Sequence, residues 1–552
     1  MLWVSDKWGR KSLAYQGSRE VDIYMMFFDQ DTYDRFRLSK EDYALLKERE
    51  DKVKKDSASK SRDSIAKANW KPDVESIDQR KIRLTPTSLS LGSYVMAPSG
   101  DKLWYTASNE RTVELWQLDL RTRESRVITK LSGSNISLSP DGKWILLQSG
   151  GGIMKLEPES GRMTPISIRS EMVLNGAGER EYILHHAWRQ VKKKFYDPKL
   201  HGLDWDMYRR NYAKFLPHIN NNHDFQELLS EILGELNASH TGGRYSPQNP
   251  AGDQTASLGL FFDEFTVSKG LKITEVIAGG PVDVSVSKIR AGHILEKIDG
   301  EEITADADWA GLLNRKAGKN VLLSLLNPTN NERYEESIKP IGSDQGLLYQ
   351  RWVNTMREMV DKLSGGKLGY VHVQGMNDGS YRTVYEEVMG RNSEKEGLIV
   401  DTRFNGGGWL HDDLVTFLNG KQYLTFRPYG FQAGGGEPMN KWTKPSIVVM
   451  SESNYSDAFI FPYAYKQIGI GKLVGKPVPG TGTAVWWEAQ IDPTLVFGIP
   501  MIATVGKEGR PTENLQLYPD LDVDLPYEAF INKKDTQIEA AVKELLKEIG
   551  KK

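Results

Sequence analysis

The 552-residue sequence contains no cysteine. Disulfide bonds, cysteine nucleophiles and thiolate metal sites are therefore excluded. The sequence also lacks an apolar run long enough to span a membrane, and its first residues, MLWVSDKWGRKSLAYQ, are charged and strand-like rather than typical of a signal peptide. We expect the chain to begin inside a domain, so these absences leave both a cytoplasmic and a periplasmic location open.

An excess of charge of one sign is missing as well. The 72 lysine and arginine residues nearly balance the 74 acidic residues, which gives a formal net charge of -2. That balance provides no electrostatic reason to expect binding to nucleic acid or to an anionic membrane. The paired histidines, His185/His186 and His218/His223, lack carboxylates at ligand spacing, so we expect no metal site and no cofactor.

Residues 1–172 are predicted to be β-rich, with a charged insertion at 38–80 that is typical of a solvated helix or loop. Two similar stretches, Asp101–Ser108 and Asp141–Gly150, follow the related turns APSGD and SPDG. This recurrence indicates blades of a partial β-propeller. About three blades can be traced, fewer than a closed propeller needs, so a small β-domain of another kind is the alternative.

Residues 173–250 are predicted to form a helical subdomain. The stretches EREYILHHAWRQVKKKFYD and HDFQELLSEILGELNASHTGG place apolar residues at helical spacing. The second helix is expected to carry Ser239 and His240 at its C-terminal end, where side chains are accessible to a ligand. His372, in the apolar strand LGYVHV, is predicted to be packed in a core instead.

Residues 251–343 resemble a PDZ domain, on the succession GLFF, ITEVIAGGPVD and IRAGHILEKIDGEEI. In that family a GLGF-type loop captures the carboxylate of a peptide, which adds a strand to the sheet edge. The resemblance implies that this loop comprises Leu258, Gly259, Leu260 and Phe261. A module that only positions other domains is the alternative.

Residues 344–552 alternate strands and helices, which is typical of an α/β domain. The apolar run Ser446–Met450 predicts a buried strand, and the spacing from Ala458 to Ile468 predicts a helix that ends at Gly469. Ser456 therefore lies at a strand-to-helix turn, where helical N–H groups can stabilise an oxyanion. Considered alone, this position is more typical of a helix N-cap.

Two further stretches of this segment can carry chemistry. Residues 405–408, NGGG, directly follow the strand-like LIVDTRF, and glycines there let backbone N–H groups face a ligand. Neither GxGxxG nor GxxxxGK[ST] is present, which disfavours nucleotide binding. A generic turn at the end of a strand remains an alternative. Glu513 and Asn514 lie in a polar loop after the strand MIATVG.

These motifs occur in a recognisable order: SHT, then NGGG, NYSDA and EN…PDLDV, with the PDZ-like segment between the first two. The sequence thereby resembles the tricorn-type branch of the C-terminal-processing serine peptidase family over roughly residues 175–545, and the β-rich segment fits the propeller that precedes this core. The resemblance implies the C-terminal part of a larger protein. It also implies peptides or unfolded proteins as substrates and a homo-oligomer, which is a hexamer in tricorn relatives.

The resemblance also implies a role for each motif. It assigns a nucleophile, a general base, two residues that complete the relay and two oxyanion-hole N–H donors: Ser456, His240, Ser239 with Glu513, and Gly406 with Asp457. A base must remove the proton of a serine hydroxyl before it attacks, and the hole stabilises the tetrahedral intermediate. We therefore expect a serine peptidase that acts through an acyl-enzyme. A catalytically inactive PDZ and propeller scaffold that binds peptides is the alternative.

Two departures from the family patterns refine this expectation. Relatives with a serine–lysine dyad carry the lysine in a glycine-flanked turn, where this chain has Thr481; Lys472 and Lys476 lie outside that turn. This favours the histidine-based mechanism. Tricorn enzymes place an acidic residue between NGGG and the nucleophile strand, but here Phe426 and Arg427 occupy the region, so a preference for basic substrates is not expected.

Overall fold

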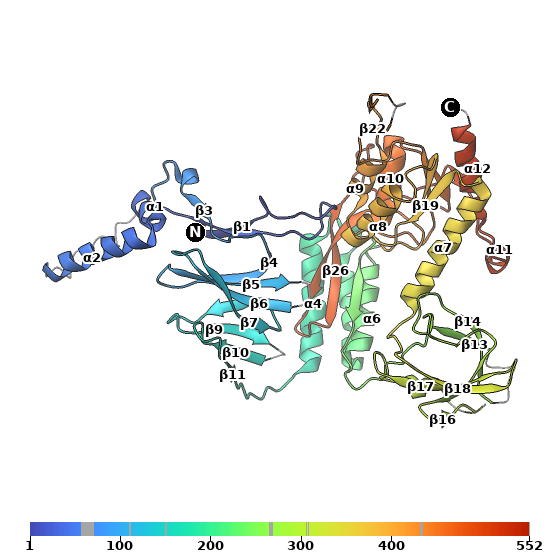
Figure 1. The fold of residues 1–552 in the computed structure, drawn as a ribbon, viewed down its shortest axis with the longest axis horizontal. Helices are drawn as coiled ribbons and strands as arrows, with labels where there is room; N and C mark the ends of the chain where they lie inside the picture. The colour runs from blue at the N-terminus through green and yellow to red at the C-terminus, as the bar shows by residue number, and fades with distance from the viewer. Residues whose placement is uncertain are drawn as a thin grey trace. The chain divides into compact units, whose positions relative to one another are not determined.

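The computed structural model describes residues 1–56, 71–109, 112–149, 152–263, 269–304, 306, 308–430 and 434–550. These residues form two compact units, Met1–Leu174 and Asn175–Lys552 (Figure 1). Part of the predicted charged insertion, residues 57–70, and part of the predicted PDZ domain, residues 264–268, lie outside the described residues.

The first unit contains three antiparallel sheets, one of three strands and two of four strands. Their strands are β1 (Leu2–Ser5), β2 (Asp22–Met26), β3 (Lys81–Arg83), β4 (Ser90–Met96), β5 (Lys102–Asn109), β6 (Thr112–Asp119), β7 (Ser125–Leu131), β8 (Ile136–Leu138), β9 (Ile145–Ser149), β10 (Gly152–Leu156) and β11 (Met163–Ile166). Trp104, Leu115 and Ile145 belong to a core between the two four-stranded sheets. Four-stranded meanders are the form of propeller blades, but no closed ring forms among the described residues, and the partial propeller stays a prediction.

Two helices of this unit, α1 (Gln30–Arg37) and α2 (Lys40–Asp56), belong to the predicted charged insertion or adjoin it. Asp29 caps α1 by accepting the Thr32 N–H at 2.7 Å. No side chain of α1 is buried, as its charged sequence leads one to expect.

The second unit begins with three helices that pack on the antiparallel sheet β12-β26-β25. These elements are α4 (Gly176–Lys194), α5 (Trp205–Ala213), α6 (Asn222–Gly234), β12 (Gly242–Tyr245), β25 (Thr483–Ala489) and β26 (Leu495–Ala503). Ile183 and Leu229 from the helices and Phe497 from β26 share one core. Because of this shared core, the predicted helical subdomain and part of the predicted peptidase domain form one body.

The prediction that Ser239 and His240 lie at the end of a helix is wrong. Helix α6 ends at Gly234, and Asn237 then adopts a left-handed conformation, with φ of 47°. The fully buried side chain of Leu236 pulls the chain back into the core directly after the helix. Ser239 and His240 consequently lie in the turn that leads into β12.

The predicted PDZ segment forms one sheet with the order β13-β14-β15-β17-β18, and β16 pairs with β15. Its strands are β13 (Leu260–Asp263), β14 (Leu271–Val276), β15 (Ile294–Ile298), β16 (Glu301–Glu302), β17 (Val321–Asn327) and β18 (Glu332–Ile338). Alternating residues such as Leu271, Ile273 and Leu323 form its core. The sheet is compatible with a PDZ domain, which stays a prediction.

The rest of the unit is built on a parallel sheet with the order β19-β20-β23-β24-β27. Its strands are β19 (Leu368–His372), β20 (Gly397–Asp401), β23 (Ser446–Met450), β24 (Lys472–Gly475) and β27 (Leu521–Asp522). Every residue of β19, β20 and β23 is buried, as expected of a parallel sheet that helices cover on both faces.

Helices cover both faces of this sheet. One face packs against α7 (Gln345–Ser364) and α12 (Thr536–Ile549), and the other against α8 (Asp378–Met389), α9 (His411–Leu418) and α10 (Asp457–Ile468). Short elements complete the unit: β21 (Leu424–Thr425), β22 (Gly436–Glu437) and α11 (Tyr527–Ile531). Ligand sites of open parallel sheets lie at the carboxyl ends of the strands, and the loops after β20 and β23 emerge there. Within the described residues, no helix has both the length and the apolar character to cross a membrane.

Candidate active site

Ser456 occupies the turn between β23 and α10, as predicted from its neighbours. Its backbone has φ of 56° and ψ of -125°, a conformation that is strained for a residue with a side chain. The Ser456 N–H donates to the Thr481 hydroxyl at 2.7 Å. The Ser456 hydroxyl stands at the N-cap position but makes no capping hydrogen bond, so the N-cap interpretation of this side chain is wrong.

Ser239, His240 and Glu513 come together although Glu513 lies more than 270 residues away in the sequence. The Glu513 carboxylate accepts the Ser239 N–H at 2.5 Å and the Ser239 hydroxyl at 3.0 Å. The Ser239 oxygen in turn lies 2.8 Å from His240 Nδ1. The three side chains therefore form a continuous chain from a carboxylate through a hydroxyl to an imidazole.

This chain selects the tautomer of His240. Because the Ser239 hydroxyl donates its proton to Glu513, its oxygen can only accept a hydrogen bond from His240. The Nδ1 atom of His240 consequently carries the proton, and Nε2 keeps its lone pair free. A neutral imidazole with a free Nε2 is the form that a general base requires.

Two residues of this arrangement escaped the sequence analysis. The Thr483 hydroxyl, at the start of β25, lies 3.0 Å from both Ser239 Oγ and His240 Nδ1. The Tyr455 hydroxyl accepts the His240 N–H at 2.6 Å, and the two rings lie 4.8 Å apart between centroids. Both are close in sequence to the predicted positions Thr481 and Ser456, but only the fold brings them to His240.

Burial shifts the pKa of both titrating groups. It lowers the pKa of His240 to about 4, and the charge of Arg244 lowers it further. Burial raises the pKa of Glu513, while hydrogen bonds from Ser239 oppose that rise. Near neutral pH, His240 is therefore uncharged and able to accept a proton.

The last contact of a catalytic relay, from His240 to Ser456, is open in this structure. Among the described residues, neither Ser456 Oγ nor His240 Nε2 has a hydrogen-bond partner. Both residues nevertheless contact Tyr455, the first as its chain neighbour and the second through its N–H and ring. Catalytic hydrogen bonds without substrate are often long and tighten on binding.

The glycine loop packs directly on the Ser456 turn. A Cβ atom on Gly407, which has φ of 96°, would lie 2.5 Å from the Ser456 Cβ and 3.1 Å from the Asp457 nitrogen. No larger residue fits there. The Gly407 N–H donates to the Asn405 side chain at 2.9 Å, while the N–H groups of Gly406 and Asp457 have no acceptor among the described residues. The N–H groups of Gly406 and Asp457 can therefore donate to a further acceptor.

The side chain of Asp457 has a structural role separate from its N–H. It is buried and accepts the N–H groups of Leu410 and His411 at 2.5 and 3.0 Å. The His411 ring also lies 2.5 Å from it at Nδ1, and this hydrogen bond raises the pKa of His411 against the opposing effect of burial. Asp457 therefore joins the start of α10 to the start of α9.

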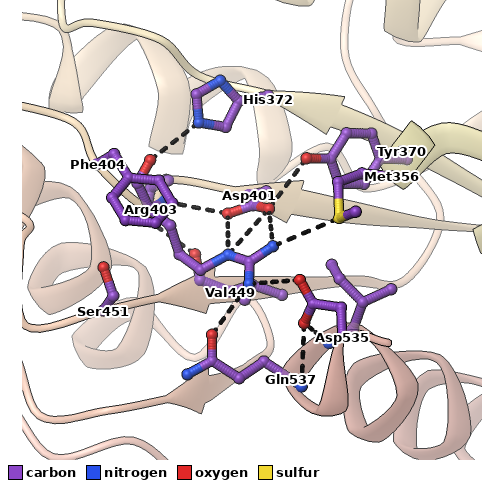
Figure 2. Close-up of polar contacts among 12 residues, drawn as sticks. Met356, Tyr370, His372, Asp401, Arg403, Phe404, Val449, Ser451, Asp535 and Gln537 are labelled. Carbon is purple, nitrogen blue, oxygen red and sulfur yellow. Dashed lines mark hydrogen bonds and ion pairs between the residues drawn. The ribbon is translucent and has the colours of Figure 1, made fainter. Parts of the chain in front are cut away.

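A buried charged cluster lies at the end of β20, just before the glycine loop (Figure 2). Its centre is Arg403, whose side chain is 1% exposed and pairs with Asp401 and Asp535 at 2.7 and 2.8 Å. Burial alone would raise the pKa of Asp401, but the Arg403 charge holds it below its usual value. His372 is buried beside the cluster, as predicted, and its Nε2–H donates to the Arg403 carbonyl at 2.9 Å.

The remaining predicted residues lie elsewhere. Leu258 and Gly259 precede β13, and Leu260 and Phe261 belong to it; they lie in a sheet separate from the one that carries the Ser456 turn. Within the described ranges, no group of three or more histidine and acidic side chains is placed to hold a metal ion. His186, one of the paired histidines, bonds to Glu488 instead.

Two family models match the chain. Residues 177–234 match the model described as the tricorn protease C1 domain, and residues 367–523 match peptidase family S41. The first match covers α4 to α6, and the second covers the parallel sheet with the glycine loop and Ser456. The two segments that supply His240 and Ser456 thus lie in or next to matched regions.

Curated relatives and a solved structure agree with these matches. The chain is 24% identical over 495 residues to the tricorn protease of Thermoplasma acidophilum, covering 86% of this chain and 45% of that protein. It is 25% identical over 438 residues to the tricorn protease homolog of Saccharolobus solfataricus, covering 75% of this chain and 40% of that protein. A crystal structure of the tricorn protease superposes with a TM-score of 0.80 at 17% identity, over 99% of this chain and 54% of that chain. The chain thus spans less than half the length of these two curated relatives.

Proposed function

We propose, on the premise that this chain belongs to the S41 peptidase family and is of the tricorn type, that it hydrolyses peptide bonds with Ser456 as nucleophile and His240 as general base. The observation that carries this proposal is the chain of contacts from Glu513 through Ser239 to His240 Nδ1, which leaves the lone pair of Nε2 available to accept a proton. Residues so distant in sequence meet in this order only if the fold assembles them.

The proposed reaction starts with a proton transfer. When a substrate is bound, His240 Nε2 accepts the Ser456 hydroxyl proton while Ser456 Oγ attacks the scissile carbonyl carbon. The imidazolium that forms is stabilised through its Nδ1–H by Ser239, which bonds to the Glu513 carboxylate. His240 then gives the proton to the leaving amine, and an acyl-enzyme on Ser456 remains.

Water completes the cycle by the same route. His240 removes a proton from the water, which attacks the acyl carbonyl, and returns a proton to Ser456 Oγ as the acid product leaves. In both halves of the reaction the carbonyl oxygen becomes an oxyanion. In the proposed reaction the N–H groups of Gly406 and Asp457 stabilise it; this is supported by their lack of another acceptor among the described residues and by the position of Asp457 at the positive end of the α10 dipole.

Peptide cleavage by the intact protein and two variants tests the assignment. We expect cleavage of an unstructured peptide by the parent, and none by Ser456→Ala or His240→Ala. Labelling of the parent by a fluorophosphonate, mapped to Ser456 by mass spectrometry, provides a readout that needs no correct substrate. Equal cleavage by the parent and Ser456→Ala contradicts the nucleophile, and an unchanged rate in His240→Ala indicates a lysine base.

A peptide-binding scaffold without activity is the second candidate, and the open contact between His240 and Ser456 is the observation in its favour. The family matches do not favour it. It predicts that neither cleavage nor labelling occurs while peptides still bind. Peptide binding itself is proposed at Leu258–Phe261, because among the described residues β13 pairs with β14 alone and leaves one edge open.

The whole-protein properties are also proposals. Peptides and unfolded proteins are the proposed substrates, on the name of the relatives as proteases. A homo-oligomer is proposed on the resemblance to tricorn proteins, and size-exclusion chromatography with light scattering tests it. A monomer at micromolar concentration contradicts the oligomer but leaves the proposed chemistry untouched.

A further inference from the structure

All hydrogen-bond donors of the Arg403 guanidinium are occupied (Figure 2). Nε donates to both oxygens of Asp401, at 3.0 and 3.1 Å. One terminal nitrogen donates to Asp535 at 2.8 Å and Gln537 at 3.1 Å, and the other donates to Asp401 at 2.7 Å and lies 3.9 Å from the Met356 sulfur. Since a guanidinium has five N–H groups, this side chain can adopt one orientation only while the contacts persist.

The cluster also joins two distant parts of the chain. Asp401 ends β20, whereas Asp535 caps α12, where its other oxygen accepts the N–H groups of Gln537 and Ile538. Two carboxylates face one guanidinium, and the N-terminus of α12 compensates the second carboxylate. The Tyr370 hydroxyl donates to Asp401 at 3.0 Å and completes the cluster on the side of β19.

The backbone of Arg403 is held as firmly as its side chain. Its N–H donates to the Asp401 carboxylate at 3.0 Å, and its carbonyl accepts the His372 Nε2–H at 2.9 Å. The next residue, Phe404, has φ of 64° and donates its N–H to the Ser453 hydroxyl at 3.2 Å. Gly406 follows Phe404 by two residues. The contacts of Arg403 and Phe404 therefore fix the backbone that leads to the Gly406 N–H.

We propose that Arg403 is a positioning residue, which fixes the loop 403–408 so that the Gly406 N–H faces the oxyanion formed at Ser456. The proposal rests on the proposed function, because an oxyanion forms only if Ser456 attacks a carbonyl. Through Asp535, the helix α12 becomes part of the support of the active site although it lies on the face of the sheet opposite α10. The C-terminal helix thereby acts on catalysis without touching substrate.

Stability alone is a weak reason for such a cluster. Desolvation of buried charges offsets most of their attraction, and well-packed apolar side chains often stabilise a core equally well. An ionic cluster fixes the orientation of its side chains, because its hydrogen bonds are lost when the partners rotate or shift. Directional control is needed at an oxyanion hole, where donors must match the position of a charge that develops during the reaction.

Two variants test the positioning role. Arg403→Lys keeps the charge but cannot make the forked contacts with Asp401 and Asp535. Asp535→Asn keeps a capping side chain for α12 and removes one of the two negative charges that hold the guanidinium. For both, we expect kcat to fall by about 10- to 100-fold while KM stays within about twofold, because the attack geometry changes and ground-state binding does not.

Two further readouts separate positioning from general damage. The affinity for a peptide aldehyde, which forms a tetrahedral adduct with the serine, should fall in parallel with kcat/KM. Hydrogen exchange followed by mass spectrometry should be faster for the peptide that contains residues 403–408 than in the parent. Arg357→Lys is the control, because one terminal nitrogen of Arg357 on α7 donates to both carboxylate oxygens of Glu387 on α8, at 2.8 and 3.0 Å. It should leave kcat unchanged.

The outcomes distinguish this proposal from the proposed function. If the parent neither cleaves peptides nor labels at Ser456, the proposed function fails, and the exchange experiment still decides whether Arg403 orders the loop. If the parent is active and Arg403→Lys and Asp535→Asn keep its kcat and aldehyde affinity, the positioning role is overturned. Equal losses in Arg357→Lys also overturn it, because any disturbance of the sheet would then have the same effect.

Discussion

The Ser239 hydroxyl lies between His240, the proposed base, and the carboxylate of Glu513. Ser239→Ala removes that bridge but leaves the Ser239 N–H to bind Glu513. We expect kcat to fall by about 100-fold with little change in KM, because the imidazolium loses a partner in the transition state. Steady-state cleavage of a fluorogenic peptide measures both constants.

Thr483→Val provides a graded comparison, since it removes a hydroxyl that lies 3.0 Å from both His240 Nδ1 and Ser239 Oγ and that also hydrogen-bonds to Glu513, but it leaves the Ser239 bridge in place. Its loss should be smaller than that of Ser239→Ala. A larger loss would show that Thr483, rather than Ser239, orients the imidazole.

The pKa of His240 predicts an unusual pH profile. Burial lowers this pKa to about 4, and only the neutral imidazole can accept the Ser456 proton. The sign follows directly: kcat/KM should be near its plateau at pH 6 and should fall only as the pH drops through about 4. Arg244→Gln, which removes the second cause of the shift, should move this acid limb to higher pH. An acid limb near the usual histidine pKa of about 6.5 in the parent would contradict the burial of the base.

At the residue scale, the sequence predicted the groups that motifs mark and missed those that only the fold selects. NYSDA, SHT and TEN point to Ser456, His240 and Glu513 through the resemblance to tricorn-type peptidases, in which motifs of this kind occur in the same order. Thr483 and Arg403 carry no such local mark. A threonine in a strand and an arginine before a loop are ordinary until their distant partners are known.

Among the elements, the glycine loop makes the sharpest demand on backbone. An alanine at 407 would put its Cβ 2.5 Å from the Ser456 Cβ, with φ at 96°. We expect Gly407→Ala to reduce fluorophosphonate labelling of Ser456 by at least about 100-fold, because the turn and the hole must both move.

Gly469→Ala is the matched control for this change. Gly469 has a comparable φ of 74° at the end of α10, but open space surrounds its Cβ position. Strain should cost about 1–2 kcal/mol of stability there and leave the labelling rate unchanged. Equal loss of labelling in both variants would mean that strain, and not the contact with Ser456, is decisive.

Strand β26 supports the base through its buried side chains. Phe497 is fully buried in the core shared with α4 and α6, so Phe497→Ala should lower the free energy of unfolding by about 3–5 kcal/mol. Met501 on the same strand is 37% exposed, and Met501→Ala should cost less than about 1 kcal/mol. Urea denaturation followed by tryptophan fluorescence compares the two. Similar costs would contradict a core at this position.

The elements themselves were largely predictable, and their ends less so. The apolar run 446–450 is a strand and the helix after it ends at Gly469, because periodicity and a glycine cap are local signals. The end of α6 at Gly234 was not predicted, since the residues up to Leu236 keep an apolar pattern that suits a helix. Core packing of Leu236, a tertiary effect, decides where that helix stops.

For the whole molecule, every proposed catalytic group lies in one compact unit. Because Ser239, His240, Ser456 and Glu513 all belong to Asn175–Lys552, a fragment of these residues should fold and label with fluorophosphonate at a rate close to that of the full chain. Circular dichroism with thermal melting and timed labelling measure both properties. A folded fragment that fails to label would show that residues 1–174 complete the site.

The order of the predicted domains along the chain could be predicted from composition and motifs. Which strands share a sheet could not be predicted in this way. The predicted helical subdomain shares the sheet β12-β26-β25 with the predicted peptidase domain, through pairs such as Gly243 with Phe497. No local signal in either of these two segments predicts a strand pairing across more than 250 residues. The same long-range pairing brings the turn with His240 to the loops of the parallel sheet.

That arrangement makes the proposed active site depend on how the two sheets sit against each other. The nucleophile turn leaves the parallel sheet, whereas the base precedes a strand of the antiparallel one, and the two sheets share no strand among the described residues. Two hydrogen bonds connect the loops of the two sheets beside Ser456 and His240. The His240 N–H donates to the Tyr455 hydroxyl, and the Ser456 N–H donates to the Thr481 hydroxyl. For the proposed reaction, a relative shift of the two sheets by about 1 Å would therefore lower the rate while both sheets stay folded, so activity can be lost without unfolding.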